Sequence, residues 1–173
     1  MTSSLYEISV PSYLQILGST GGFLEKAIAH FQEKKTDVAE IVETRLFPDM
    51  LPFRFQIQAL VQHSVGAIDG LKNGLFKPPA GLPNSDYREL QTLIADAQNT
   101  LQMISPETVN ACAGREMIFE IRGTRIPFTA EGFVTSFSLP NFYFHATTAY
   151  DILRSKGAPL GKRDFLGRMR LKA

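Results

Sequence analysis

The sequence has little of what several large classes of protein require. A single cysteine among 173 residues excludes an internal disulfide, and no set of Cys and His has zinc-finger spacing. With 18 basic and 17 acidic side chains the formal charge is +1, so the positive excess of a nucleic-acid binder is missing. No apolar run approaches the roughly 20 residues of a membrane span, and the first residues do not resemble a signal peptide. We therefore expect a cytoplasmic protein whose partners include neither nucleic acid nor a membrane.

Common catalytic motifs are also absent. The chain has no P-loop, no Gly-x-Gly-x-x-Gly, no Gly-x-Ser-x-Gly, no His-Glu-x-x-His and no Cys-x-x-Cys. What is present is a composition of 44% hydrophobic and 20% charged residues, which is typical of a globular protein. The length suits one domain and no linker or repeat divides it, so we predict a single domain over residues 1–173.

Helical periodicity is the strongest pattern. Apolar residues repeat at intervals of three and four over residues 14–31 and 90–104, and a third stripe covers residues 53–71. Pro11 suits the first turn of the first helix, because its missing N–H would be unpaired there. A fourth helical pattern runs from about Ala130 to Lys156, with an interruption at Leu139-Pro140.

Two short β-prone runs separate the third and fourth helical patterns. Residues 117–121 and 124–128 flank Arg122-Gly123, which predicts a hairpin. Four long helices, short connections and one hairpin predict an all-α protein. We expect a four-helix bundle with a short β-hairpin between the third and fourth long helices.

The main candidates for chemistry are the histidines, because a neutral imidazole acts as a base near pH 7. His145 falls within the apolar stripe of its predicted helix, so its ring should point into the bundle. Asn141 lies one turn earlier on the same face and Thr148 lies at i+3. Such a group is either a satisfied polar network in the core or the centre of a site. We take His145 and Asn141 as candidate catalytic residues.

Six further side chains are candidates for substrate contact: Tyr143, Thr148, Gln58, His30, Asp49 and Arg45. Each has an ordinary alternative. Arg45 and Asp49 flank a proline and fix its turn if they do not bind a ligand, and His30 flanks an apolar stripe. Gln58 reaches an interior ligand only if the bundle is wide at that level. Tyrosine hydroxyls near His145 would suit an aromatic or polyphenolic ligand.

Several strings together resemble one family. Those strings are residues 45–52 (Arg-Leu-Phe-Pro-Asp-Met-Leu-Pro), 139–150 (Leu-Pro-Asn-Phe-Tyr-Phe-His-Ala-Thr-Thr-Ala-Tyr) and 161–167 (Gly-Lys-Arg-Asp-Phe-Leu-Gly), with Ser4-Leu5-Tyr6 and Val10-Pro11. Together they resemble an uncharacterised domain-of-unknown-function family. That family is part of the DinB/YfiT-like superfamily. The resemblance covers almost the whole chain and implies a DinB-like four-helix bundle, often dimeric.

The resemblance also implies a type of site. Many DinB relatives hold a divalent metal, such as zinc or nickel, with one His from the second helix and a His-x-x-x-His pair on the fourth. Some of them transfer or isomerise small molecules with a low-molecular-weight thiol. Here the pair reads Asn141-x-x-x-His145, and His63 lies on the helix of the remaining ligand. His145 and His63 are the candidate metal ligands. Because this set of ligands is incomplete, we favour a protein without a cofactor over one that binds a metal.

Three functions remain open. The first is a small-molecule enzyme of isomerase, cyclase or dehydratase type, in which His145 transfers a proton in a pocket inside the bundle. The second is a metal-dependent DinB-like transferase that uses His145, His63 and either His30 or Asn141. The third is a non-catalytic dimeric bundle that binds a ligand or a partner protein. Long apolar stripes and a weakly charged surface favour a homodimer.

Overall fold

Helix α1 (Leu5–Glu33) is the longest element of the computed structural model, which describes residues 3–79 and 81–172. It begins at a capping box, in which the Ser4 hydroxyl accepts from the Glu7 N–H and the Glu7 carboxylate accepts from the Ser4 N–H. The prediction that Pro11 lies in the first turn is wrong, because the helix already begins at Leu5. The cap and the buried side chains of Leu5 and Val10 stabilise this end, although Pro11 lacks one N–H of the helical ladder.

The predicted helices over residues 53–71 and from Ala130 to Lys156 each contain a π-helical turn. Along the chain these segments are α3 (Phe53–Val61), the π-helical η1 (Gln62–Gly66), α4 (Ala67–Asn73), α7 (Ala130–Gly132), the π-helical η2 (Phe133–Ser138) and α8 (Leu139–Ser155). A π turn holds more residues than an α turn, so it changes the face on which later residues lie. The predicted interruption at Leu139-Pro140 is wrong, because the helix continues through it and Pro140 lies in the first turn of α8.

The other helices of the described residues are the long α5 (Tyr87–Gln102) and the short α2 (Val38–Glu43), α6 (Pro106–Asn110) and α9 (Lys162–Leu166). The Asp37 carboxylate accepts from the Ala39 N–H at the start of α2. Helix α5 begins with a capping box of Asp86 and Glu89. Short polar side chains before an apolar pattern thus mark both helix starts.

The strands β1 (Leu75–Phe76), β2 (Glu116–Ile121) and β3 (Thr124–Thr129) form one sheet in the order β1-β2-β3. Strands β2 and β3 are the predicted antiparallel hairpin, closed at Arg122-Gly123, where both residues have positive φ. Strand β1 pairs in parallel with β2, so the sheet is mixed. The all-α prediction is corrected by this sheet, to a mostly helical fold. A strand of two residues is too short to show the period of two by which strands are recognised.

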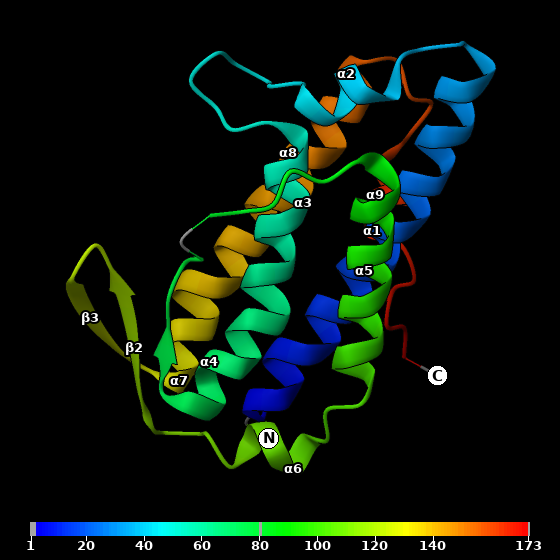
Figure 1. The fold of residues 1–173 in the computed structure, drawn as a ribbon. Helices are drawn as coiled ribbons and strands as arrows, with labels where there is room; N and C mark the ends of the chain where they lie inside the picture. The colour runs from blue at the N-terminus through cyan, green and yellow to red at the C-terminus, as the bar shows by residue number, and fades with distance from the viewer. Residues whose placement is uncertain (1–2, 80, 173) are drawn as a thin grey trace.

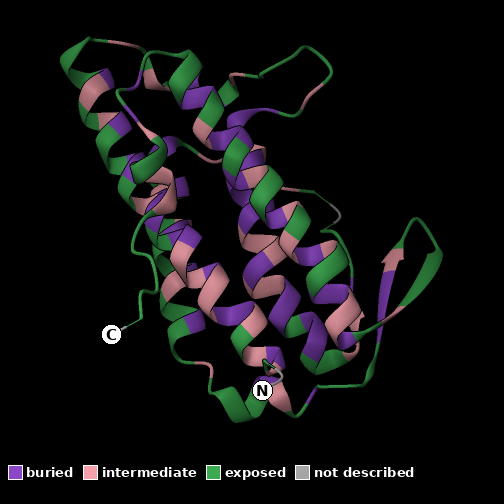
Figure 2. Ribbon diagram, turned by 180° about the vertical axis from the view of Figure 1, so that it is seen from behind, coloured by how far each residue is buried: buried purple, intermediate pink, exposed green. Residues whose placement is uncertain are grey.

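Figure 1 shows the long helical segments side by side, with the hairpin of β2 and β3 beside α4 and α7. Helix α1 packs against α5 and α8, and α3 packs against α5 and α8. Figure 2 shows buried residues concentrated where these helices face one another. The largest fully buried side chains include Tyr13, Phe23, Phe31, Phe53, Phe133 and Phe142. In the part of the chain that the structure describes, no helix has the length and apolar character needed to cross a membrane.

The last helix, α9, packs on the first. The Lys26 ammonium lies 3.1 Å from the Asp164 carboxylate, and the Gln15 amide donates to the Leu166 carbonyl at 3.0 Å. Gly167 follows with a φ of +58°, and a Cβ added there would stand 2.8 Å from the Cβ of Ser19. A residue without a side chain is therefore needed where the chain turns over α1.

Candidate functional site

The candidate site is a pocket of about 470 Å³ between helical and sheet elements. One side is formed by α3, η1, η2 and α8, and the other by β1, β2 and the loop that follows β1. Most of its wall is apolar and includes Phe55, Phe76, Leu82, Phe119, Ile121 and Phe137. His63, His145, Asn141 and Gln62 provide polar groups, and Arg54 also lines the pocket. A few polar groups in an apolar pocket are the ordinary composition of a small-molecule site.

The fold brings His63 and His145 together. His63 lies in the π-helical η1 and His145 in the middle of α8. Their ring centroids are 5.6 Å apart and their planes differ by 20°. A π turn often marks a functional site, because it moves a side chain off the regular face of its helix. His63 therefore lines the pocket, although the sequence places it on the flank of the apolar stripe of its helix.

A buried glutamine determines the tautomer of His145. The Gln56 amide N–H donates to the Leu51 carbonyl at 2.8 Å, so the amide oxygen is the end that faces His145. That oxygen lies 2.8 Å from Nδ1 of His145, and an amide oxygen can only accept a hydrogen bond. Nδ1 of His145 must therefore carry the proton, which leaves Nε2 with an unprotonated lone pair.

His63 sits among aromatic rings. Its ring centroid lies 5.5 Å from those of Phe76 and Phe137. Its Nδ1 atom is buried and has no hydrogen-bond partner among the described residues. An unpaired lone pair costs less to bury than an unpaired N–H, so we assign the proton of His63 to Nε2.

Both imidazoles are neutral at pH 7. Burial lowers the pKa of His145 from its ordinary 6.5 to about 4. Burial also lowers the pKa of His63 to about 4, and the neighbouring His145 lowers it further because two positive rings would repel. The pair therefore acts through lone pairs and N–H groups rather than through positive charge.

A chain of hydroxyl groups joins the two π-helical turns behind the pocket. The Ser138 hydroxyl in η2 donates to the His63 carbonyl in η1 at 2.6 Å. Because that proton is used, the Tyr13 hydroxyl donates to the Ser138 oxygen, at 2.7 Å. Burial raises the pKa of the Tyr13 phenol, which therefore remains protonated. The chain fixes the backbone of η1 next to α8, and it was not anticipated from the sequence.

The two amides of the pocket are oriented by backbone carbonyls. The Asn141 N–H donates to the Phe137 carbonyl at 2.7 Å, and the Gln62 N–H donates to the Lys77 carbonyl at 3.1 Å. A carbonyl accepts only from the nitrogen end, so the oxygen of each amide is left free, and each nitrogen keeps a second N–H. Gly66 makes room for the Gln62 amide, because a Cβ there would stand 3.0 Å from it.

The other residues proposed from the sequence do not line this pocket. Thr148 is buried and its hydroxyl donates to the Phe144 carbonyl of its own helix. Tyr143 is exposed on α8. Gln58 is buried on α3, but its amide donates to the Pro83 carbonyl and the Ser85 hydroxyl.

Three further candidates also lie outside the pocket. His30 packs edge-on against Phe31 near the end of α1. The Arg45 guanidinium donates to the Met50 carbonyl at 2.6 Å and so closes the turn between α2 and α3. Asp49 is exposed in that turn.

Sequence reasoning missed the aromatic wall and the glutamine that orients His145. The wall comes from β1, β2, α3 and η2, and no local spacing links segments so far apart. Gln56 had a weak signal, because it lies between two apolar residues of the predicted stripe region, Phe55 and the core position Ile57. A glutamine flanked by Phe55 and Ile57 is a candidate for burial with a specific partner.

The donor set does not fit the divalent metal implied by the resemblance. His63 and His145 offer two imidazoles, and Asn141 offers a carboxamide that is a poor ligand for zinc. Among residues 3–79 and 81–172, no group of three or more His, Cys, Asp or Glu side chains is placed to hold a metal ion. A zinc centre takes three or four protein ligands, so we derive no step that requires a metal.

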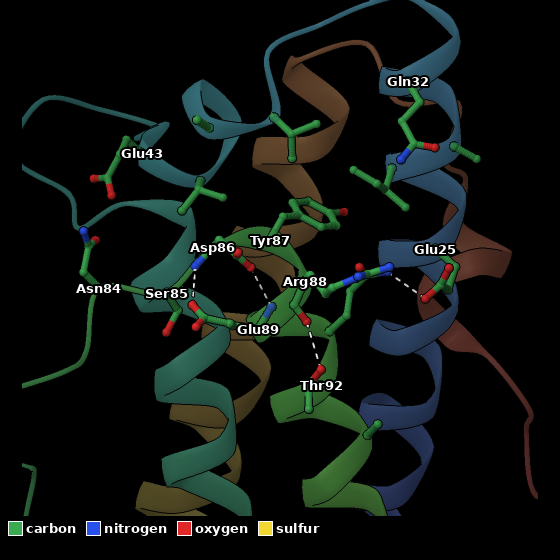
Figure 3. Close-up of a pocket in the computed structure, with 17 residues that line it drawn as sticks. Glu25, Gln32, Glu43, Asn84, Ser85, Asp86, Tyr87, Arg88, Glu89 and Thr92 are labelled. Carbon is green, nitrogen blue, oxygen red and sulfur yellow. Dashed lines mark hydrogen bonds between the residues drawn. The ribbon is translucent and has the colours of Figure 1, made fainter.

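A larger open hollow of about 1170 Å³ lies between α1, α2 and α5. Figure 3 shows its polar side chains, many of which bond to one another. Asp86 and Glu89 form the capping box of α5, the Gln91 amide donates to Glu25, and Glu43 pairs with Arg54. We assign no chemistry to this hollow, because these side chains already serve helix ends and contacts between helices.

Comparison with known proteins agrees with this architecture. A crystal structure of a DinB family member protein from Shewanella denitrificans matches with a TM-score of 0.82 and 29% sequence identity, over 98% of this chain and 95% of that one. No match was found among curated proteins. The family model DUF1993, described as a domain of unknown function, matches residues 5–166. The chain therefore belongs to the DUF1993 family and has a DinB-like fold.

Proposed function

We propose that the protein is a small-molecule enzyme in which His145 moves a proton between two atoms of a bound substrate. The observation that carries the proposal is the hydrogen bond between Nδ1 of His145 and Gln56. It leaves Nε2 of His145 unprotonated on a residue that lines a mostly apolar pocket. A fixed tautomer with one free lone pair is the arrangement that a general base requires.

The proposed step needs no second reagent. Nε2 takes a proton from an acidic C–H or O–H bond, and the electron pair of that bond stays on the substrate. The imidazolium then returns the proton to another substrate atom, which completes an isomerisation or a cyclisation. In a dehydration the returned proton leaves with a hydroxide as water. The Gln56 oxygen accepts from Nδ1–H throughout and stabilises the imidazolium.

The lowered pKa limits which substrates suit this chemistry. With a pKa of about 4, the protonated ring is more acidic than an ordinary imidazolium and returns its proton more readily. Abstraction is correspondingly harder, because each pKa unit between base and substrate costs about 1.4 kcal/mol. The proposal therefore favours a substrate whose proton is already acidic, such as one beside a conjugated carbonyl.

Hydrogen–deuterium exchange tests the proton transfer directly. The probe is 2-tetralone in D₂O, a bicyclic ketone with an acidic C–H, followed by NMR. We expect the protein to accelerate exchange and His145→Gln to reduce that acceleration about 100-fold. His30→Gln, which alters a histidine outside the pocket, should leave the rate unchanged. Equal rates for the wild-type protein and His145→Gln would contradict the proposal.

A second candidate is a binding protein without catalysis. The low pKa of both imidazoles supports it, because a ring that resists protonation is a weak base, whereas its lone pair can still accept a hydrogen bond from a ligand. The exchange experiment separates the two candidates. A protein that binds the ketone without accelerating exchange is a binding protein.

We also propose that the helical segments form a four-helix bundle of DinB type and that two copies associate. The TM-score of 0.82 to a DinB family member supports the bundle. Large exposed apolar side chains, among them Phe47 at 65% and Phe144 at 55% exposure, support association. Light scattering coupled to size exclusion tests this, and a mass of one chain, 19.2 kDa, would contradict the dimer.

A further inference from the structure

The polar groups of the candidate pocket differ in how many of their donors are already used. Nδ1–H of His145 donates to Gln56, the Asn141 amide donates to Phe137, and the Gln62 amide donates to Lys77. What these three residues can still offer to a ligand is one nitrogen lone pair, two carbonyl oxygens and the second N–H of each amide. The only N–H of His145 is thus used, so its Nε2 atom can only accept, whereas each amide keeps both an acceptor and a donor.

The pocket also has little charge to offer. Both imidazoles are neutral because burial opposes their protonation. Arg54 lines the pocket, but its Nε lies 2.6 Å from the Glu43 carboxylate, which balances its charge. An anionic ligand would meet only neutral donors, such as Nε2–H of His63, and an ammonium ion would meet no carboxylate among the residues that line the pocket. Either ion would lose its hydration without a matching partner.

The wall of the pocket sets the shape of the ligand. Phe55, Phe76, Phe119 and Phe137 line it from different elements. Aromatic side chains pack well against flat rings, edge to face or offset. A volume of about 470 Å³ is within the range of small-molecule sites and accommodates a fused two-ring compound.

We propose that the pocket selects neutral aromatic hydroxyl compounds, whose O–H donates to Nε2 of His145 and whose rings lie against the phenylalanine wall. This proposal rests on the proposed function and specifies its ligand. The ring provides apolar area, and the hydroxyl provides the donor that the free lone pair on Nε2 of His145 requires. A ligand of the same shape without a donor leaves Nε2 of His145 unpaired, and a site discriminates strongly against a ligand that leaves its buried polar groups unpaired.

Three matched probes test this inference on the wild-type protein at pH 7. They are 2-naphthol, which donates one hydrogen bond; 2-methoxynaphthalene, which has no donor; and 2-naphthoate, which is an anion. Calorimetry gives the dissociation constants, and ¹⁵N NMR of labelled histidines reports whether His63 and His145 respond. We expect 2-naphthol to bind at least tenfold more tightly than the methyl ether, although the ether is more apolar. The naphthoate should bind most weakly.

A substitution at His145 tests whether its Nε2 atom is the acceptor of the ligand's hydrogen bond. His145→Phe keeps an aromatic ring but removes Nε2, so we expect it to weaken 2-naphthol about tenfold and to leave the methyl ether nearly unchanged. The matched control His30→Phe should leave both dissociation constants unchanged. Circular dichroism confirms that each variant is folded. The three-probe comparison on the wild-type protein decides the question even if His145→Phe does not fold.

The outcomes separate this inference from the proposed function. If the methyl ether or the naphthoate binds as tightly as 2-naphthol and shifts the histidine resonances, the donor inference is overturned but the pocket remains a ligand site. If the probes bind without any change in the resonances of His63 and His145, both proposals are overturned. If none of the probes binds at millimolar concentration, both are likewise overturned.

Discussion

At the scale of single residues, Gln56 is the side chain that gives His145 its chemical character. Its amide is held at one end by the Leu51 carbonyl and faces Nδ1 of His145 at the other. Without this contact the imidazole would be free to adopt either neutral tautomer. The position of the proton on His145 therefore depends on a residue that does not itself line the pocket.

Replacing Gln56 should release the tautomer of His145. In Gln56→Met a side chain of similar length removes the acceptor and leaves a half-buried N–H without a partner. We expect Nδ1 of His145 to lose its proton to Nε2, seen as an exchange of the two ¹⁵N shifts in NMR. The free energy of unfolding should fall by about 1–2 kcal/mol.

Gln58→Met is the matched control. Gln58 is also buried on α3, but its amide donates to the Pro83 carbonyl and the Ser85 hydroxyl and has no hydrogen bond to a histidine among the described residues. It should lose stability without any change in the ¹⁵N shifts of His145. A tautomer of His145 that is unchanged in Gln56→Met would contradict the assigned role.

At the scale of elements, the two π-helical turns shape the site. Segment η1 carries His63, and Ser138 at the end of η2 bonds to its carbonyl. The sequence predicts helices in both places but not the π turns, because apolar periodicity averages over a single widened turn. The hairpin was predicted correctly from its two β-prone runs, whereas β1 is too short to be recognised.

Removing the Ser138 hydroxyl should loosen the contact between these turns. Ser138→Ala leaves the Tyr13 hydroxyl and the His63 carbonyl without their partner, and Tyr13 is fully buried. We expect a loss of about 2 kcal/mol in urea denaturation and a changed ¹⁵N resonance for His63. Ser136→Ala, at an exposed position of the same π turn, should change the stability by less than about 1 kcal/mol. Equal losses in the two variants would contradict this role.

Two glycines allow a test of how closely β1 packs on α4. A Cβ at Gly70 would stand 2.8 Å from the Met117 methyl group and 3.2 Å from Cβ of Phe76, whereas Gly22 has nothing within 4 Å. Gly70→Ala should therefore destabilise by about 1–3 kcal/mol, despite the better helix propensity of alanine. Gly22→Ala should stabilise by about 0.5–1 kcal/mol. Thermal denaturation shows whether each variant is more or less stable than the wild-type protein. A Gly70→Ala variant that is more stable would show that Met117 and Phe76 can move to make room for the added methyl group.

At the scale of the whole molecule, the two buried histidines should make stability depend on pH. Their pKa is about 4 in the folded chain and 6.5 when exposed. Between these values the unfolded chain binds more protons, so the free energy of unfolding falls as the pH falls from about 6.5 to 4. The expected loss between pH 7 and pH 5 is about 2 kcal/mol for each imidazole. Carboxylates with a lowered pKa, such as Asp164, titrate below this range.

Urea denaturation at pH 7, 6 and 5 measures this loss. His63→Phe should remove roughly half of it, because one buried imidazole remains. His30→Gln should keep all of it, since the change lies outside the pocket. A free energy of unfolding that is flat between pH 7 and pH 5 would mean that the pocket admits enough water to ionise both rings.

The overall architecture was more predictable than the site. Long apolar stripes specify helices and the face that each of them buries, as the burial of Leu90, Ile94 and Leu101 on α5 shows. The site depends on contacts between distant segments, such as His63 with His145 and Ser138 with Tyr13. Residue spacing within one segment does not encode such contacts, so the sequence names His145, His63 and Asn141 as candidates but not Gln56 or the aromatic wall beside them.

The docking of α9 on α1 has a consequence for synthesis on the ribosome. Residues near the start of the chain, Ser19 and Lys26, contact Gly167 and Asp164 near its end. The face of α1 that α9 covers stays exposed in the nascent chain until residues 162–167 have been translated. Contacts between such distant positions delay folding and leave apolar surface open to aggregation in the meantime. A nascent chain arrested before residue 162 should therefore be the form that chaperones bind and proteases cut.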